Sequence, residues 1–220
     1  MKSLPLSLSG VALGIALSAA DYHVDWKTVM LLLMAVCFLH AYSVSGKSGR
    51  NKTMSYICLA LTIAAGLGML HFSFGTVFLM EPLILSVFGY MIIRAARHTD
   101  FVSRGKGILY VFLMFGLLAF YGSYYVCSHS FGSWPLLFPA LSAGFLNVAA
   151  RTEEEQKVFR IMMTASGWVA MTLFACLRMY DPWHFLFVLS IPIFLIPKCK
   201  VWAPLAFSLL TGLGFLVYLM

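Results

Sequence analysis

The sequence predicts an all-helical protein embedded in a membrane, and three observations lead to this fold class. First, 61% of the 220 residues are apolar and only 10% are charged, which is more apolar surface than a water-soluble domain of this length can bury. Second, the apolar residues are gathered into stretches long enough to cross a bilayer as helices. Third, the basic residues fall almost entirely in alternate connections between these stretches.

Nine apolar stretches are predicted to be transmembrane helices, since about 20 helical residues cross the hydrocarbon core. In order along the chain they cover residues 4–20, 27–45, 54–72, 74–95, 107–127, 133–150, 157–178, 183–197 and 201–219. Because backbone polar groups cannot stay unpaired in lipid, we expect these helices to pack as one bundle in a single domain over residues 1–220.

Several of the stretches have features of their own. The first begins after one lysine, as a signal peptide does, but no small-residue cleavage signal precedes a soluble domain, so we expect it to be retained. The fourth contains Glu81 beside Pro82, and this glutamate is the one acid well inside a stretch. The eighth is short and contains Pro192 and Pro197, which makes it the weakest of the nine predictions.

The lysines and arginines predict the orientation of the chain. With nine spans, one side of the membrane receives only Lys27 and Arg178, and the other side receives the remaining 13 of the 15 basic residues. The basic side faces the cytoplasm. We therefore expect a multi-pass protein of the inner, cytoplasmic membrane with its N-terminus inside and its C-terminus outside.

The composition also argues against other classes of protein. The net charge of +7 comes from short scattered clusters that form no nucleic-acid-binding face. The five cysteines form no CxxC pair and no metal-type spacing, so we interpret them as small apolar residues within the membrane.

Three predicted cytoplasmic connections, residues 43–52, 94–107 and 150–157, hold most of the polar side chains. The simpler interpretation is that they are topology signals and solvated turns. The alternative is a shared site for an anionic ligand, because arginine and lysine near helix ends bind phosphate groups. The candidates that charge favours for such contacts are Lys47, Arg94, Arg97, Arg104 and Lys106.

The acidic residues offer weaker candidates. Glu153, Glu154 and Glu155 do not converge on one ion when adjacent helical residues point about 100° apart, and acids before the seventh span complement its dipole. Glu81 is a functional candidate because a carboxylate within a membrane is costly. The outer turn with Asp21, His23 and Asp25 has metal-like alternation, but we favour a solvated turn.

Three stretches together resemble the UbiA superfamily of intramembrane prenyltransferases, in particular the menaquinone-pathway branch that prenylates 1,4-dihydroxy-2-naphthoate. They are "SLPLSLSGVALG" (3–14), "RGKGILYVFLMFGLLAFYGSYYV" (104–126) and "PALSAGFLNVAA" (139–150). The second is the most specific of the three. The resemblance implies a UbiA-like helical bundle and two aspartate-rich loops that hold Mg²⁺ around the diphosphate of a polyprenyl donor.

The chain departs from the family where the metal ligands belong. In "CFLHAYSVS" (37–45), Tyr42 matches the first motif, but His40 and Ala41 stand where asparagine and aspartate would. Ile108 replaces a further acid, and the second motif offers glutamates in one block and no aspartate. Because a divalent cation neutralises the departing diphosphate, these losses predict impaired catalysis.

We therefore predict a catalytically inactive UbiA-like protein, a pseudoenzyme, with no resident cofactor. It would bind a polyprenyl or quinone-type lipid or serve as an accessory membrane subunit for another protein. By resemblance, His40, Tyr42 and Asn147 line the ligand site, and Gly10, Gly14, Gly116, Gly122 and Gly144 let helices approach closely. Two alternatives stay open: an active Mg²⁺-dependent aromatic prenyltransferase with a divergent metal site, and a purely structural membrane subunit.

Overall fold

The computed structural model describes residues 4–48, 52–72, 106–152, 154–178, 182–196 and 199–218. Within these residues the chain is helical and contains no β-strand, as expected for a backbone in lipid, where each N–H and C=O is paired inside its own segment. The chain divides into two compact units, Val24–Gly107 and Lys2–His23 with Ile108–Met220.

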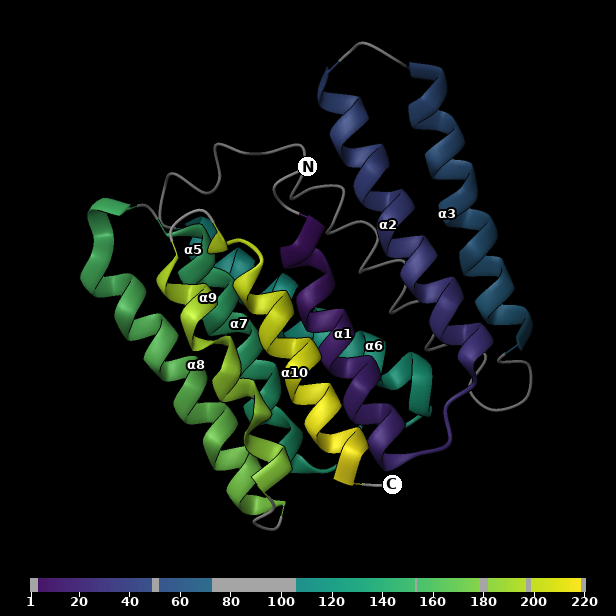
Figure 1. Cartoon of the computed structure of the whole chain (residues 1–220). Coiled ribbons are helices and arrows are strands. Elements are labelled where there is room, and N and C mark those ends of the chain that lie inside the picture. The colour runs from purple at the N-terminus through teal and green to yellow at the C-terminus, as the bar shows by residue number, and fades with distance from the viewer. Residues whose placement is uncertain are drawn as a thin grey trace. The chain divides into compact units, whose positions relative to one another are not determined.

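The first unit contains helices α2 (Trp26–Ser48) and α3 (Lys52–Phe72), which lie side by side (Figure 1). Asp25 begins α2 as an N-cap, because its carboxylate accepts a hydrogen bond from the backbone N–H of Lys27 at 3.1 Å. The Thr28 hydroxyl donates to the same carboxylate at 3.3 Å. These hydrogen bonds give Asp25 a structural role at the start of α2.

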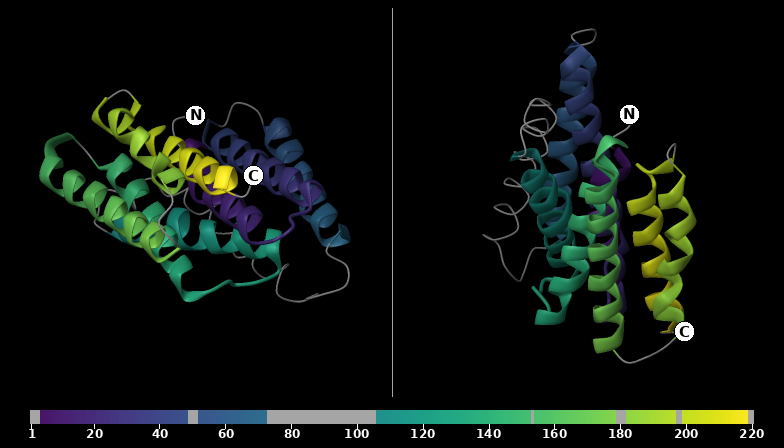
Figure 2. Two further views of the ribbon diagram at one scale, coloured as in Figure 1. Left: turned by 60° about the horizontal axis from the view of Figure 1, so that its bottom comes forward. Right: turned by 90° about the vertical axis from the view of Figure 1, so that its left-hand side faces the viewer.

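The second unit contains the other described helices. They are α1 (Leu4–Asp21), α5 (Lys106–Val111), η2 (Phe112–Leu118), α6 (Ala119–Ser128), η3 (Trp134–Leu136), α7 (Leu137–Arg151), η4 (Glu154–Gln156), α8 (Lys157–Leu177), η5 (Pro182–Ser190), α9 (Ile191–Leu195) and α10 (Ala203–Tyr218). Within this unit α1 packs against both α6 and α10, α7 packs against α8 and η2, and α10 packs against η5 (Figure 2).

Glycines mark the closest approaches between helices of the second unit. A Cβ atom at Gly10 or Gly14 of α1 would meet the backbone carbonyl of Phe115 or Phe120. A Cβ at Gly116 would meet the Cα of Gly144 on α7. The prediction that small residues allow these helices to approach closely is confirmed at these four glycines.

The helix predicted over 107–127 has an irregular turn. It runs from Lys106 to Ser128, but Phe112–Leu118 is wound as a π-helix. The π segment includes Gly116, where α7 comes closest. Such wide turns leave backbone carbonyls available to other donors.

The buried interior of the second unit is mostly aromatic and aliphatic. Its fully buried large side chains include Leu13, Phe120, Tyr124, Phe174, Phe187 and Phe207.

Helices occupy eight of the nine predicted stretches, and the stretch 74–95 lies outside the described residues. In the eighth stretch the chain is a 3₁₀-helix up to Ser190, and Pro192, which lacks an N–H, lies in the first turn of α9. Four described helices are long and apolar enough to cross a membrane: Leu4–Asp21, Lys52–Met69, Gly107–Ser128 and Lys157–Leu177. These features support an integral membrane protein made of helices.

Candidate functional site

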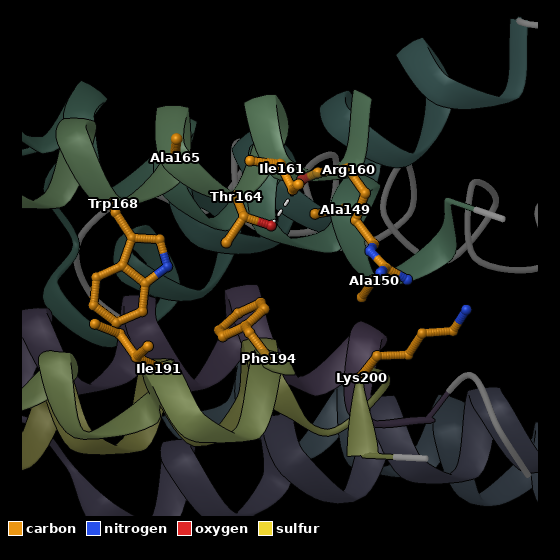
Figure 3. Close-up of a pocket in the computed structure, with 10 residues that line it drawn as sticks. All are labelled: Ala149, Ala150, Arg160, Ile161, Thr164, Ala165, Trp168, Ile191, Phe194 and Lys200. Carbon is orange, nitrogen blue, oxygen red and sulfur yellow. Dashed lines mark hydrogen bonds between the residues drawn. The ribbon is translucent and has the colours of Figure 1, made fainter. Parts of the chain in front are cut away.

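A cleft of about 400 Å³ opens between α8 and α9 in the second unit (Figure 3). It is lined by Ala149, Ala150, Arg160, Ile161, Thr164, Ala165, Trp168, Ile191, Phe194 and Lys200. This volume lies within the range of small-molecule sites in proteins, about 300–1,000 Å³. Because most of the lining is apolar and the charged residues are few, the cleft has the composition of a ligand site.

One wall of the cleft is a single stripe of α8. Arg160, Ile161, Thr164, Ala165 and Trp168 recur at the spacing that places residues on one face of a helix. The Thr164 hydroxyl donates a hydrogen bond to the Arg160 carbonyl at 2.8 Å, so this polar group is satisfied within the helix. Eight residues separate Arg160 from Trp168, which corresponds to about 12 Å along the axis.

An aromatic cluster forms the apolar end of the cleft. The Trp168 ring lies 5.3 Å from Phe187, 6.2 Å from Phe194 and 5.4 Å from Phe207 between centroids. Edge-to-face and tilted contacts of this kind hold an aromatic ring in one orientation. Trp168 is therefore held in place at the apolar end of the cleft, while the small side chain of Ala165 leaves space beside it.

The other end of the cleft is cationic. Arg160 from α8 and Lys200 from the turn before α10 reach toward the same end from opposite walls, whereas Trp168 and Ile191 lie at the far end (Figure 3). Both cationic side chains are partly buried. Among the described residues neither forms an ion pair with an acid, so their charges can serve an anionic ligand.

A second polar cluster lies at the opposite end of α8, where the charges are already paired. The Arg178 guanidinium, at the C-cap of α8, donates two hydrogen bonds to the Asp21 carboxylate at the end of α1, one of them at 2.8 Å. The Tyr124 hydroxyl donates to the same carboxylate at 2.7 Å. Arg178 also lies over the Phe174 ring, 5.4 Å from its centroid. This cluster ties three helices together and gives both oxygens of the Asp21 carboxylate a hydrogen-bond donor.

A third polar group is buried in the middle of the second unit. Asn147 is fully buried, and its amide donates to the carbonyl of Phe115 in the π-helix at 2.9 Å. The Ser9 hydroxyl donates to the Asn147 side-chain oxygen at 3.0 Å. These bonds satisfy the carbonyl that the wide turn leaves available. The ligand role predicted for Asn147 stays a prediction.

The predicted ligand residues on the second span belong to the first unit. His40 is buried on α2, Tyr42 is partly buried there, and Lys47 lies in the last turn of the same helix. Of the other predicted cationic contacts, Lys106 begins α5, and Arg94, Arg97 and Arg104 lie outside the described residues.

Among the acidic candidates, Glu155 is exposed in the short helix η4, which also includes Glu154. Glu81 and Glu153 lie outside the described residues. Within the part of the chain that is described, no three His, Cys, Asp or Glu side chains are close enough together to hold a metal ion. The Mg²⁺ site of the active alternative thus has no candidate among the described side chains, and its presence or absence stays a prediction.

No protein-family model matches the sequence, and no characterised protein matches it significantly.

Sequence reasoning placed Arg160 and Lys200 on the cytoplasmic side but missed the cleft that they line. The stripe on α8 was readable from its spacing, since 160, 164 and 168 recur every four residues. The spacing does not predict the opposite wall of the cleft, because Ile191, Phe194 and Lys200 come from a different part of the chain.

Proposed function

We propose that this chain is a nine-span membrane protein with a UbiA-like bundle that binds a polyprenyl or quinone-type lipid without transferring prenyl groups. The proposal rests on one observation above all: an apolar cleft with two cations at one end has the shape and polarity of a site for an amphiphilic ligand. Its aromatic end suits an isoprenoid chain or ring, and its cationic end suits a polar head group.

The described helices support the coarser part of this proposal, a membrane protein made of helices. Described helices coincide with the predicted stretches that resemble the family at 3–14, 104–126 and 139–150. In the predicted orientation Arg160 lies at the cytoplasmic end of α8 and Arg178 at its outer end, and Lys200 lies on the cytoplasmic side in the turn before α10. Lys157–Leu177, at 21 residues, corresponds to about 31 Å of helix, close to the thickness of a hydrocarbon core.

The argument against catalysis comes from the missing carboxylates of the first motif. The window 37–53 contains no aspartate or glutamate, and each ~1.4 kcal/mol of lost transition-state stabilisation lowers the rate about tenfold. We therefore expect binding to survive where prenyl transfer does not.

Two measurements on the purified full-length protein test the proposal. Lipids extracted from the protein in a neutral detergent are identified by mass spectrometry, and we expect an isoprenoid lipid in stoichiometric amount. Prenyl transfer from a polyprenyl diphosphate to a naphthoate acceptor is then measured with and without Mg²⁺, and we expect no turnover. Metal-dependent turnover would favour the active prenyltransferase, which the 104–126 motif supports. A stoichiometric protein partner with no bound lipid would favour the structural subunit.

A further inference from the structure

The two cations of the cleft point to the chemical class of the head group. We infer that the cleft binds a single-chain lipid with a phosphate-ester head group, held by Arg160 and Lys200 through direct contacts. This inference rests on the proposed function, because it specifies which amphiphile the same cleft takes.

The head-group end supplies the donors that a phosphate requires. Arginine presents a planar fork of N–H groups that binds phosphate oxygens in pairs, and lysine adds a compact charge with three donors. Arg160 and Lys200 come from opposite walls of the cleft (Figure 3), so one anion between them would be held from both sides. A neutral quinone head would satisfy neither charge.

The rest of the cleft suits one chain. Beyond the cations the lining is formed by small or apolar side chains, including Ile161, Ala165 and Phe194. The stripe from Arg160 to Trp168 extends about 12 Å along the axis of α8 and ends at the aromatic cluster. One face of α8 forms a whole wall of the cleft, and the cleft volume is about 400 Å³. A space of this size accommodates a single chain better than the paired chains of a glycerophospholipid.

The paired cluster at the other end of α8 provides an internal contrast. There Arg178 is held by the Asp21 carboxylate within the chain. Arg160 and Lys200 have no such carboxylate among the described residues, and a cation that is partly withdrawn from water gains most from a bound anion. The phosphate ester would neutralise Arg160 and Lys200 in the way that the Asp21 carboxylate neutralises Arg178 at the other end of α8.

Binding of defined probes to the full-length protein tests the inference. In a neutral detergent with a metal chelator present, affinities are measured for dodecyl phosphate, dodecanol, inorganic phosphate and two-chain phosphatidic acid. We expect dodecyl phosphate to bind most tightly, because only this probe fills both ends of the cleft. Arg160→Gln and Lys200→Gln should each weaken its binding about tenfold, the loss expected for one charge-assisted hydrogen bond.

Lys157→Gln is the matched control, because Lys157 is exposed on the first turn of the same helix and does not line the cleft. It should leave binding unchanged, and thermal unfolding should confirm that all three variants are folded. Equal binding of dodecanol would overturn the head-group assignment while leaving lipid binding intact. Equal binding of inorganic phosphate, tighter binding of phosphatidic acid, or binding that requires added Mg²⁺ would each overturn the inference. If no probe binds and the purified protein also carries no lipid, the proposed function fails with it.

Discussion

Helix α8 carries an arginine near each end, and the two arginines differ in whether an acidic side chain neutralises the charge. Arg178 pairs with Asp21, which also accepts a hydrogen bond from Tyr124. Arg160 lines an apolar cleft with Lys200 and has no acidic partner among the described residues. The residues lie 18 positions apart, which corresponds to about 27 Å along the helix, close to the distance between two membrane interfaces.

This contrast separates a structural cluster from a candidate binding site. At Arg178 every group in the cluster has a partner within the chain, so the energy of the contacts stabilises the fold. At Arg160 the charges can be neutralised by a molecule from outside. Substitutions at the first cluster should therefore change stability, and substitutions at the second should change binding.

The largest effect is expected from Asp21→Asn. The substitution removes the charge that Arg178 and Tyr124 share and should lower the free energy of unfolding by about 2 kcal/mol, between the values for exposed and buried ion pairs. Denaturation in detergent measures it. Asp25→Asn is the matched control, because Asp25 is an exposed N-cap of α2 and the asparagine still caps the helix. An equal loss of unfolding free energy in both variants would contradict a special structural role for the Arg178 cluster.

The next effect concerns binding rather than stability. Ala165→Leu would place three more carbon atoms in the cleft beside Trp168 and should weaken binding of dodecyl phosphate about tenfold, or about 1.4 kcal/mol. Isothermal titration calorimetry measures the affinity. Ala64→Leu, at an exposed position of α3, provides the same chemical change away from the cleft and should have no effect. If both variants bind as the wild type does, the chain does not enter the cleft.

A smaller effect is expected from Tyr124→Phe. The variant keeps the ring in the core and removes one hydrogen bond to Asp21, so the free energy of unfolding should fall by about 1 kcal/mol. Tyr121→Phe, in the same helix, serves as the control, because the Tyr121 ring packs on Phe120 at 5.3 Å between centroids. Lipid binding should be unchanged in both, and a loss of binding in Tyr124→Phe would contradict the separation of the two clusters.

The smallest effect is expected from salt. Raising the ionic strength from about 0.01 M to about 1 M shortens the Debye length from about 30 Å to about 3 Å. Because Arg160 and Lys200 are only partly buried, binding of dodecyl phosphate should weaken about threefold over this range. The stability difference between the wild type and Asp21→Asn should change less, since the Asp21 side chain is only 13% exposed. Salt-independent binding would argue against phosphate recognition at the cleft.

The sequence was sufficient to predict the helices and several of their contacts. Hydropathy alone located the stretches that became α1, α3 and α8, because lipid requires long continuous apolar helices. The small residues Gly10, Gly116 and Gly144 were expected at close contacts, and they lie there.

The candidate site was harder to predict, because composition does not distinguish a lipid-facing surface from an internal one. In the sequence, the Arg160 stripe on α8 has the same pattern as any apolar helix face with a charge at its end. It becomes a site only because α9 stands apart from it and Lys200, 40 positions later, reaches the same end. That pairing depends on tertiary packing, which spacing along the chain does not encode.

Asn147 shows a similar limit. Its position in a stretch resembling a ligand-binding motif predicted contact with a ligand, while its side chain also binds the carbonyl of Phe115 and the hydroxyl of Ser9. A polar residue in lipid can serve packing or chemistry, and sequence pattern alone cannot separate the two roles.

The π-helical segment Phe112–Leu118 has a consequence for the far end of its helix. A wide turn holds one residue more than an ordinary α-turn, so it resets the angular register of everything that follows it. Deleting one residue within this segment would rotate the following residues by about 100° about the helix axis, and Tyr124 would turn away from Asp21. The extra residue in the middle of this helix thus determines whether a hydroxyl and a carboxylate meet near its end.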